Sequence, residues 1–161
     1  MKTGFEFIKS RKLEETINLT NIEQLFNFTF PPIFKIFVEN FHFSSKGLQV
    51  DKHIDDLRGF EVPSEAIIYS PSKDWANPIY IDQFRELEEI LSGFEEEDDW
   101  IVKGLINIGY TSIGSRICLG CLQSNQDQVW EVNDDSVFEN KYSFLAENIF
   151  VFIRGFDSKK I

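Results

Sequence analysis

Two cysteines, Cys118 and Cys121, have the most suggestive chemical spacing in this sequence, because Cys-x-x-Cys occurs in thiol redox sites and in zinc sites. A redox pair needs its first thiolate at a helix N-terminus, which lowers the thiol pKa, and a zinc site needs four ligands. Here both cysteines lie in a pattern typical of a β-strand, where residues three apart point to opposite faces. The sequence therefore predicts two buried, inert thiols, with a catalytic thiol as the alternative.

The other residues that could do chemistry form no recognisable constellation. His42 and His53 are the only histidines, and they lack the spacing of metal sites. The glycines between 109 and 120 match no phosphate-binding motif. Paired acids such as Asp134-Asp135 could act as acid and base only if burial separated their pKa values. We expect a protein that is not an enzyme, with no catalytic residue, metal or cofactor; an enzyme whose site assembles only in the fold is an alternative.

The densest charge in the sequence is the run Glu95-Glu96-Glu97-Asp98-Asp99, which Trp100 follows directly. Like charges repel one another, so the run is expected on a solvated turn rather than in the centre of a helix. Trp is enriched at the centres of protein interfaces. Residues 95–100 are therefore the candidate partner-binding segment. A solvated acidic turn beside a Trp that anchors the core explains the same pattern.

Composition and charge narrow the classes of partner. The 161 residues are 42% hydrophobic and include 17 Phe, which is enough apolar surface for one folded domain over 1–161. The pattern of elements is weakest between Phe43 and Tyr80. The formal net charge of -11 repels nucleic acid and anionic membranes, whereas it would attract a basic protein. No apolar run is long enough for a secretory signal or a membrane span. Because only two cysteines occur, we expect a cytoplasmic protein.

The elements that would position these residues begin with helices. Thr20-Asn21-Ile22-Glu23 has the Ser/Thr-x-x-Glu pattern of a capping box and predicts a helix that starts there and runs through Phe26. Pro32 suits the first turn of a second helix. The apolar residues of that helix share one face: Ile33, Phe34, Phe37, Val38 and Phe41. Short strands are expected at 47–51 and 66–69, and a third helix over 82–91, followed by Gly93 as a left-handed cap.

After residue 104 the pattern changes to strands. Segments 105–108, 116–122 and 128–132 are rich in Ile, Val and Leu and are separated by turn residues, which predicts an antiparallel meander. Ser143 is the predicted N-cap of a last helix, which runs through Ile149 and ends at Arg154 and Gly155. The expected fold is α+β, with N-terminal helices, a central antiparallel or mixed sheet and a C-terminal helix.

Apolar residues and glycines at both ends of the chain follow a characteristic order. The front carries Ile22-Glu23, Leu25, Phe30-Pro31 and the segment 34–41. The back carries Leu105-Ile106-Asn107-Ile108-Gly109, Gly114, Ile117-Cys118-Leu119, Val129-Trp130, Phe144-Leu145-Ala146 and Phe150-Val151-Phe152-Ile153. This order resembles the SUKH superfamily. Two positions depart from it: Asn40-Phe41 stands where the family usually has Asn-Gly, and Gly120-Cys121 where an Asp is common.

The resemblance implies a SUKH-like fold and a role in toxin immunity. Bacterial members of the superfamily are commonly immunity proteins, and its eukaryotic relatives include a yeast regulator of cell-wall synthesis. It implies a cytoplasmic protein that neutralises a contact-delivered toxin by stoichiometric binding. Many such toxins are nucleases with basic clefts, which an acidic partner would complement. An intracellular regulator or adaptor of the same fold is the alternative, and the toxin's identity, the contact face and the oligomeric state stay open.

Overall fold

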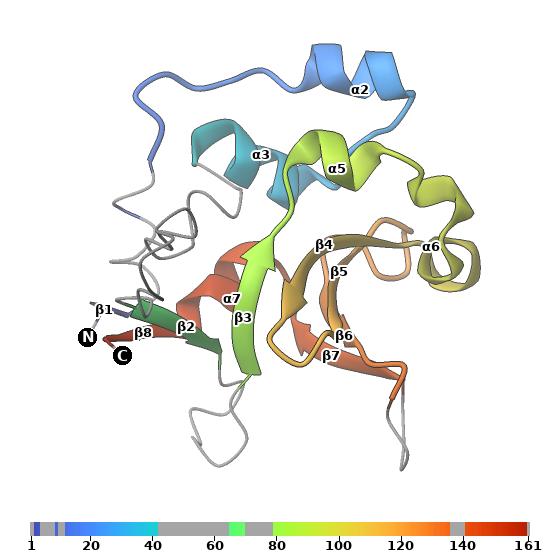
Figure 1. Ribbon diagram of the computed structural model, residues 1–161. Helices are drawn as coiled ribbons and strands as arrows, with labels where there is room; N and C mark the ends of the chain where they lie inside the picture. Colours follow the sequence, from blue (N-terminus) through green and yellow to red (C-terminus); the bar gives the residue numbers. More distant parts are fainter. Residues whose placement is uncertain are drawn as a thin grey trace, which may run out of the picture.

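The computed structural model describes residues 2–3, 9, 12–41, 65–69, 79–135 and 141–160. Within them, one sheet has the strand order β1-β8-β2-β3-β4-β5-β6-β7, and every neighbouring pair is antiparallel (Figure 1). The strands are β1 (Lys2–Thr3), β2 (Glu65–Tyr69), β3 (Ile79–Phe84), β4 (Leu105–Thr111), β5 (Arg116–Gly120), β6 (Val129–Val132), β7 (Tyr142–Ala146) and β8 (Phe156–Lys160). The helices are α2 (Thr20–Phe26), α3 (Pro32–Asn40), α5 (Leu87–Leu91), the 3-10 turn η1 (Phe94–Glu96), α6 (Asp98–Lys103) and α7 (Ile149–Arg154). The predicted α+β class and the meander of β4, β5 and β6 are confirmed.

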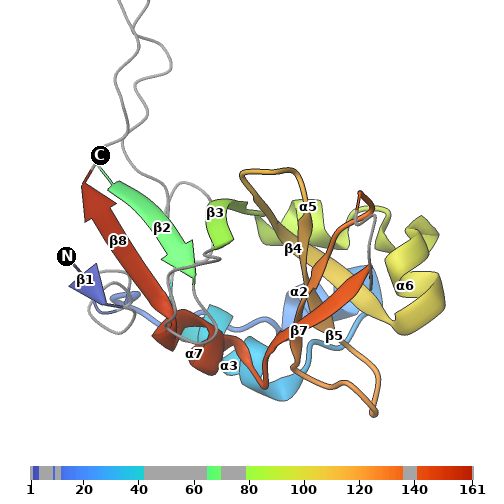
Figure 2. The same ribbon diagram turned by 90° about the horizontal axis from the view of Figure 1, so that it is seen from below.

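The main core lies between one face of the sheet and the helices. In β4 and β5 that face carries Ile106, Ile108, Ile117 and Leu119, all fully buried. The helices α3 and α7 lie side by side against it, with the rings of Phe37 and Phe150 5.5 Å apart (Figure 2). Burying each such side chain contributes about 1.5 to 3 kcal/mol. No helix in the described part of the chain is long and apolar enough to cross a membrane.

The start of α3 is held by a residue more than 90 positions away in the sequence. The helix begins at Pro32 as predicted. Its free N–H groups find their acceptor in the turn between β5 and β6, where the Asp127 carboxylate accepts from Ile33 N at 3.2 Å and from Phe34 N at 2.9 Å. Asp127 is buried and has a left-handed φ of 66°. This turn is thereby fastened to the helix that covers the core.

The predicted capping box of α2 is wrong. The N-cap position is Leu19, and no side chain caps the helix from that position; Asn18 Oδ1 instead accepts from Thr20 N at 2.9 Å. The Glu23 carboxylate faces the next segment, where it accepts from Phe30 N at 2.8 Å and from Lys35 Nζ at 2.6 Å. A cation and a free N–H group outside the helix therefore compete successfully for this carboxylate.

Two predicted helices are strands for part of their length. Residues 79–84 form β3, because Ile81 and Phe84 are buried and β3 pairs with β4, so the helix predicted over 82–91 shortens to α5. Residues 142–146 form β7, so Ser143 is not an N-cap. The last helix starts after Asn148, whose Oδ1 accepts from Val151 N at 3.0 Å. In both places pairing with a neighbouring strand outweighs the helical spacing of the apolar residues.

The remaining predictions concern β2, the end of α7 and the segment 42–53. The strand expected at 66–69 is β2, and the basic residue Arg154 ends α7 as expected, with Gly155 at its C-cap. The strand expected at 47–51, together with His42 and His53, lies outside the described residues. The strand β8, which pairs with both β1 and β2, was not predicted from the sequence.

Candidate functional site

The face of β4 to β7 opposite the main core is built from two rows of paired residues. One row is Tyr110, Arg116, Val132 and Tyr142, and the other is Asn107, Cys118, Trp130 and Phe144. Directly opposed residues in paired strands point to the same face of a sheet. An irregularity in β4 between Asn107 and Gly109 places one extra residue there, so Asn107 and Tyr110 share this face although they are three apart. We call it the open face.

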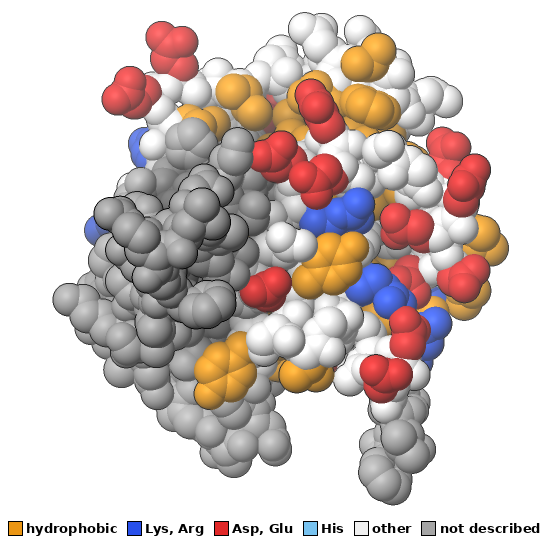
Figure 3. Space-filling view, in the orientation of Figure 1, with side chains coloured by type: hydrophobic (Ala, Val, Ile, Leu, Met, Phe, Trp, Pro, Cys, Tyr) orange, Lys and Arg blue, Asp and Glu red, His pale blue; other side chains and the backbone are white. Residues whose placement is uncertain are grey.

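An open hollow of about 410 Å³ lies at the end of the open face next to α6. Its carboxylates are Glu96, Glu97, Asp98, Asp99 and Asp134. Its cationic side chains are Arg116 and Lys141, and Asn107 and Tyr110 complete the lining. Carboxylates surround the few Lys and Arg side chains on this side of the molecule (Figure 3). The lining therefore carries an excess of negative charge.

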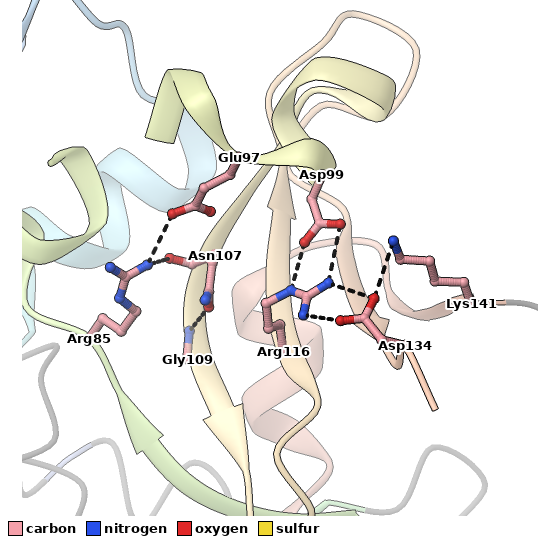
Figure 4. Close-up of polar contacts among 8 residues, drawn as sticks. All are labelled: Arg85, Glu97, Asp99, Asn107, Gly109, Arg116, Asp134 and Lys141. Carbon is pink, nitrogen blue, oxygen red and sulfur yellow. Dashed lines mark hydrogen bonds and ion pairs between the residues drawn. The ribbon is translucent and has the colours of Figure 1, made fainter. Parts of the chain in front are cut away.

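Arg116 neutralises two of these carboxylates. Its Nε donates to Asp99 Oδ2 at 2.7 Å, and its Nη1 donates to Asp134 Oδ2 at 2.7 Å (Figure 4). Lys141 Nζ adds an ion pair to Asp134 at 3.2 Å. Hydrogen bonds from Arg116 and Lys141 lower the pKa of Asp134 from its ordinary value of 3.8 to about 2, and the pKa of Arg116 is raised, first by the bond to Asp134. Asp134 is therefore ionised at neutral pH, and Arg116 pairs with both aspartates.

Glu97 is paired much more loosely. Among the described residues, the cation that pairs with it is Arg85, whose Nη1 lies 3.9 Å from Glu97 Oε1. The same Nη1 donates to the main-chain oxygen of Asn107 at 3.2 Å (Figure 4). Its Nη2 donates to the main-chain oxygen of Glu89 at 2.8 Å. Burial raises the pKa of Glu97, while Arg85 acts in the opposite direction. Glu97 is thus a half-buried carboxylate whose negative charge is only partly neutralised by Arg85.

The structure separates the residues of the candidate segment 95–100. Glu95, Glu96 and Asp98 are exposed, whereas Asp99 is buried against Arg116. The run lies outside a helix centre, as predicted, but it is not a loop: it occupies η1 and the first turn of α6. Acidic residues are favourable in the first turn of a helix, where the backbone N–H groups point at them.

Trp100 takes the second of its two predicted positions. Its ring packs against the main core, 4.8 Å from the ring of Phe94 and 5.9 Å from that of Phe28. It therefore anchors α6 to the core. The aromatic residues that line the open face come instead from β6 and β7.

These aromatic residues, Trp130, Tyr142 and Phe144, were not predicted as site residues from the sequence. Trp130 and Tyr142 cover a second small cluster of buried side chains, formed by Leu105, Cys118 and Val132. Phe144 stacks edge-to-face on Trp130 at 5.5 Å and is 49% exposed. Alternation along 142–146 would have indicated this surface, had that segment been interpreted as a strand.

Two lysines connect the aromatic part of the open face to the hollow. Lys103 Nζ lies 4.8 Å from the centre of the Tyr142 ring, and Lys141 Nζ lies 5.5 Å from it. Lys141 also lines the hollow through its ion pair with Asp134. The acidic hollow and the aromatic residues therefore form one continuous surface.

Both cysteines are free, and they point to opposite faces as predicted, but only Cys118 is fully buried. Cys118 is fully buried in the small cluster under the open face, whereas the partly buried Cys121 packs against the main core on the other side. Burial raises the pKa of both thiols, that of Cys121 to about 12. The thiolate form is therefore disfavoured at neutral pH. Among the described residues, no three His, Cys, Asp or Glu side chains are grouped so that they could hold a metal ion.

Comparisons with protein-family models, with curated proteins and with solved structures found no match to this chain. Its function is therefore inferred from its own residues. The open face places an acidic hollow on the same surface as the exposed Phe144 ring and the partly buried Trp130 and Tyr142, an arrangement suited to binding another protein.

Proposed function

We propose that this chain is an immunity protein that binds a basic toxin domain of the nuclease class and neutralises it stoichiometrically in the cytoplasm. The proposal begins from the resemblance of the sequence to the SUKH superfamily. The net charge of -11 supports it, because an acidic protein is attracted to the basic cleft of a nuclease. No chemical step by this chain is needed for that role.

The observation that carries the proposal is the composition of the open face. Phe144 and Trp130 offer an aromatic contact, and the neighbouring hollow offers carboxylates. Aromatic residues at the centre of an interface commonly account for most of the binding energy, while charges steer the encounter and select the partner. A basic protein with an apolar anchor would match both parts.

The direct test is co-expression with the toxin domain encoded immediately upstream of this chain's gene. We expect restored growth of the host cells and a one-to-one complex in gel filtration. Failure of both rescue and complex formation would refute the proposal for that pair. Binding to a host protein in place of the toxin would instead favour an adaptor of the same fold.

A matched pair of variants tests whether the open face makes the contact. Phe144→Ala should weaken toxin binding by about fivefold or more, as expected for an interface aromatic whose truncation costs more than about 1 kcal/mol. Leu25→Ala is the control, because Leu25 is 78% exposed on α2, outside the open face. Equal affinities of the two variants would exclude Phe144 from the interface.

A further inference from the structure

Asn107 carries a buried hydrogen-bond donor that lines the hollow. The residue is 2% exposed, and its Oδ1 accepts from Gly109 N at 3.0 Å. That bond fixes the orientation of the amide, because a backbone N–H must face the oxygen end. The Nδ2 end has no hydrogen-bond partner among the described residues. A buried donor without an acceptor is costly, so it indicates that an acceptor oxygen is supplied from outside.

Glu97, which lines the same hollow, lacks a closely paired cation among the described residues. Within the described part of the chain, the one ion pair of its carboxylate is the 3.9 Å contact with Arg85. Arg85 cannot approach as a bidentate partner while it holds the main-chain oxygens of Asn107 and Glu89. The hollow therefore presents a carboxylate that needs a cation next to an amide that needs an acceptor.

An arginine residue in a loop carries both missing groups. Its guanidinium binds carboxylates through two parallel N–H groups and is more weakly hydrated than an ammonium group, which favours it in a partly buried site. Its main chain supplies carbonyl oxygens. A bound divalent ion fits less well, because the described residues contain no cluster of three or more metal-ligating side chains.

We propose that the hollow receives an arginine side chain from a loop of the protein partner. Glu97 binds the guanidinium, and Asn107 Nδ2 donates to a main-chain carbonyl of the same loop. Asp99 and Asp134 do not take part directly, since Arg116 already pairs with both. This inference rests on the proposed function and names the contact by which the partner is recognised.

The probe is a capped Gly-Arg-Gly peptide, compared with the same peptide containing citrulline, which has the shape of arginine without its charge. Titration into the full chain is followed by NMR at the side-chain amide of Asn107 and the backbone amide of Glu97. We expect saturable shifts with the arginine peptide in about the millimolar range, as suits one side chain. The citrulline peptide should bind about tenfold more weakly.

Two conservative variants form the matched control. Glu97→Gln keeps the size of the side chain and should weaken binding of the arginine peptide by about tenfold, because it removes the charge that holds the guanidinium. Glu95→Gln changes an exposed neighbour outside the hollow and should leave binding unchanged. Thermal unfolding of both variants checks that the fold is intact.

Three outcomes would overturn the inference: equal binding of the two peptides, no shift at Asn107 or Glu97, or equal binding by the two variants. The toxin experiment separates this inference from the proposed function. If the upstream toxin binds the wild type and the Glu97→Gln variant equally, the hollow is excluded while immunity stands. If the arginine peptide binds at the hollow and the toxin does not, immunity fails while the arginine site stands.

Discussion

Asp127, in the turn between β5 and β6, stabilises a helix that lies far from it in the sequence. Its two carboxylate oxygens accept from consecutive backbone N–H groups of α3, at 3.2 and 2.9 Å. A side chain that caps a helix typically contributes about 1 kcal/mol and up to about 2 kcal/mol. Burial of Asp127 places it at the upper end of that range.

Asp127→Ala should lower the free energy of unfolding by about 2 kcal/mol, since it removes the cap and puts alanine at a φ of 66°. Asp127→Asn should cost less, because asparagine keeps one acceptor oxygen and tolerates the left-handed region. Urea unfolding measures both changes. Asp135→Ala is the control at an exposed site. Equal losses for Asp127→Ala and Asp135→Ala would contradict the capping role.

Asp134 makes the stability of the protein depend on pH in the acidic range. Its pKa is lowered from 3.8 to about 2 in the folded protein, so its stabilising contribution is complete above pH 4 and is lost as the pH falls toward 2. Its side chain is 53% exposed, so solvent screening limits that contribution to at most about 1 kcal/mol.

Asp134→Asn should therefore reduce the free energy of unfolding at pH 7, and the difference from the wild type should shrink between pH 4 and pH 2. Urea unfolding at a series of pH values gives this difference directly. The exposed neighbour Asp135→Asn should show no such trend. A difference for Asp134→Asn that stays constant down to pH 2 would disprove the pairing with Arg116 and Lys141.

Residue-level prediction from sequence succeeded for burial and failed for polar partners. The divergence of Cys118 and Cys121 follows from alternation along a strand, which is a local property. Glu23 and Asp127 were assigned to no long-range contact, because their partners lie 7 to 94 positions away. The hollow shares this difficulty, since Glu97 and Asn107 line the same hollow only when α6 packs on β4.

At the scale of elements, the spacing of apolar residues correctly predicted the helices and strands whose spacing matches the structure that they adopt. The helix α3 has one apolar face, and β4 to β6 are rich in branched residues, so both were predicted. The segments β3 and β7 also contain residues at helical spacing, and only pairing with β4 and β6 makes them strands. The aromatic part of the open face was missed for this reason.

The boundary between β7 and α7 offers a test at this scale. Asn148→Ala should lower the free energy of unfolding by about 1 kcal/mol, because Asn148 Oδ1 caps Val151 N. Ser143→Ala is the matched control: Ser143 is exposed on β7 and caps nothing in the described structure, so the change should stay within about 0.5 kcal/mol. The midpoint of urea unfolding reports both. The reverse ranking would restore the helix start predicted from the sequence.

At the scale of the whole molecule, the net charge can be calculated from the sequence, whereas the strand order and the positions of the charges depend on the fold. The -11 charge is a sum and needs no fold, whereas the order β1-β8-β2-β3 joins strands from both ends of the chain. The sum does not say where the charge acts. The fold shows it, because η1 carries Glu96, which lines the hollow, and its neighbour Glu95. Glu14 and Glu15 belong instead to the segment that precedes α2 and line no part of the hollow.

Two double variants of equal net charge test whether position or total charge governs association. Glu95→Gln with Glu96→Gln, and Glu14→Gln with Glu15→Gln, each remove two exposed carboxylates. Charges act over about 8 Å at physiological ionic strength. The first variant should therefore slow association with the basic toxin domain by several-fold and weaken its salt dependence, while the second should not. Stopped-flow association at several salt concentrations measures both. If the two variants slow association equally, steering depends on the net charge and not on the edge of the hollow.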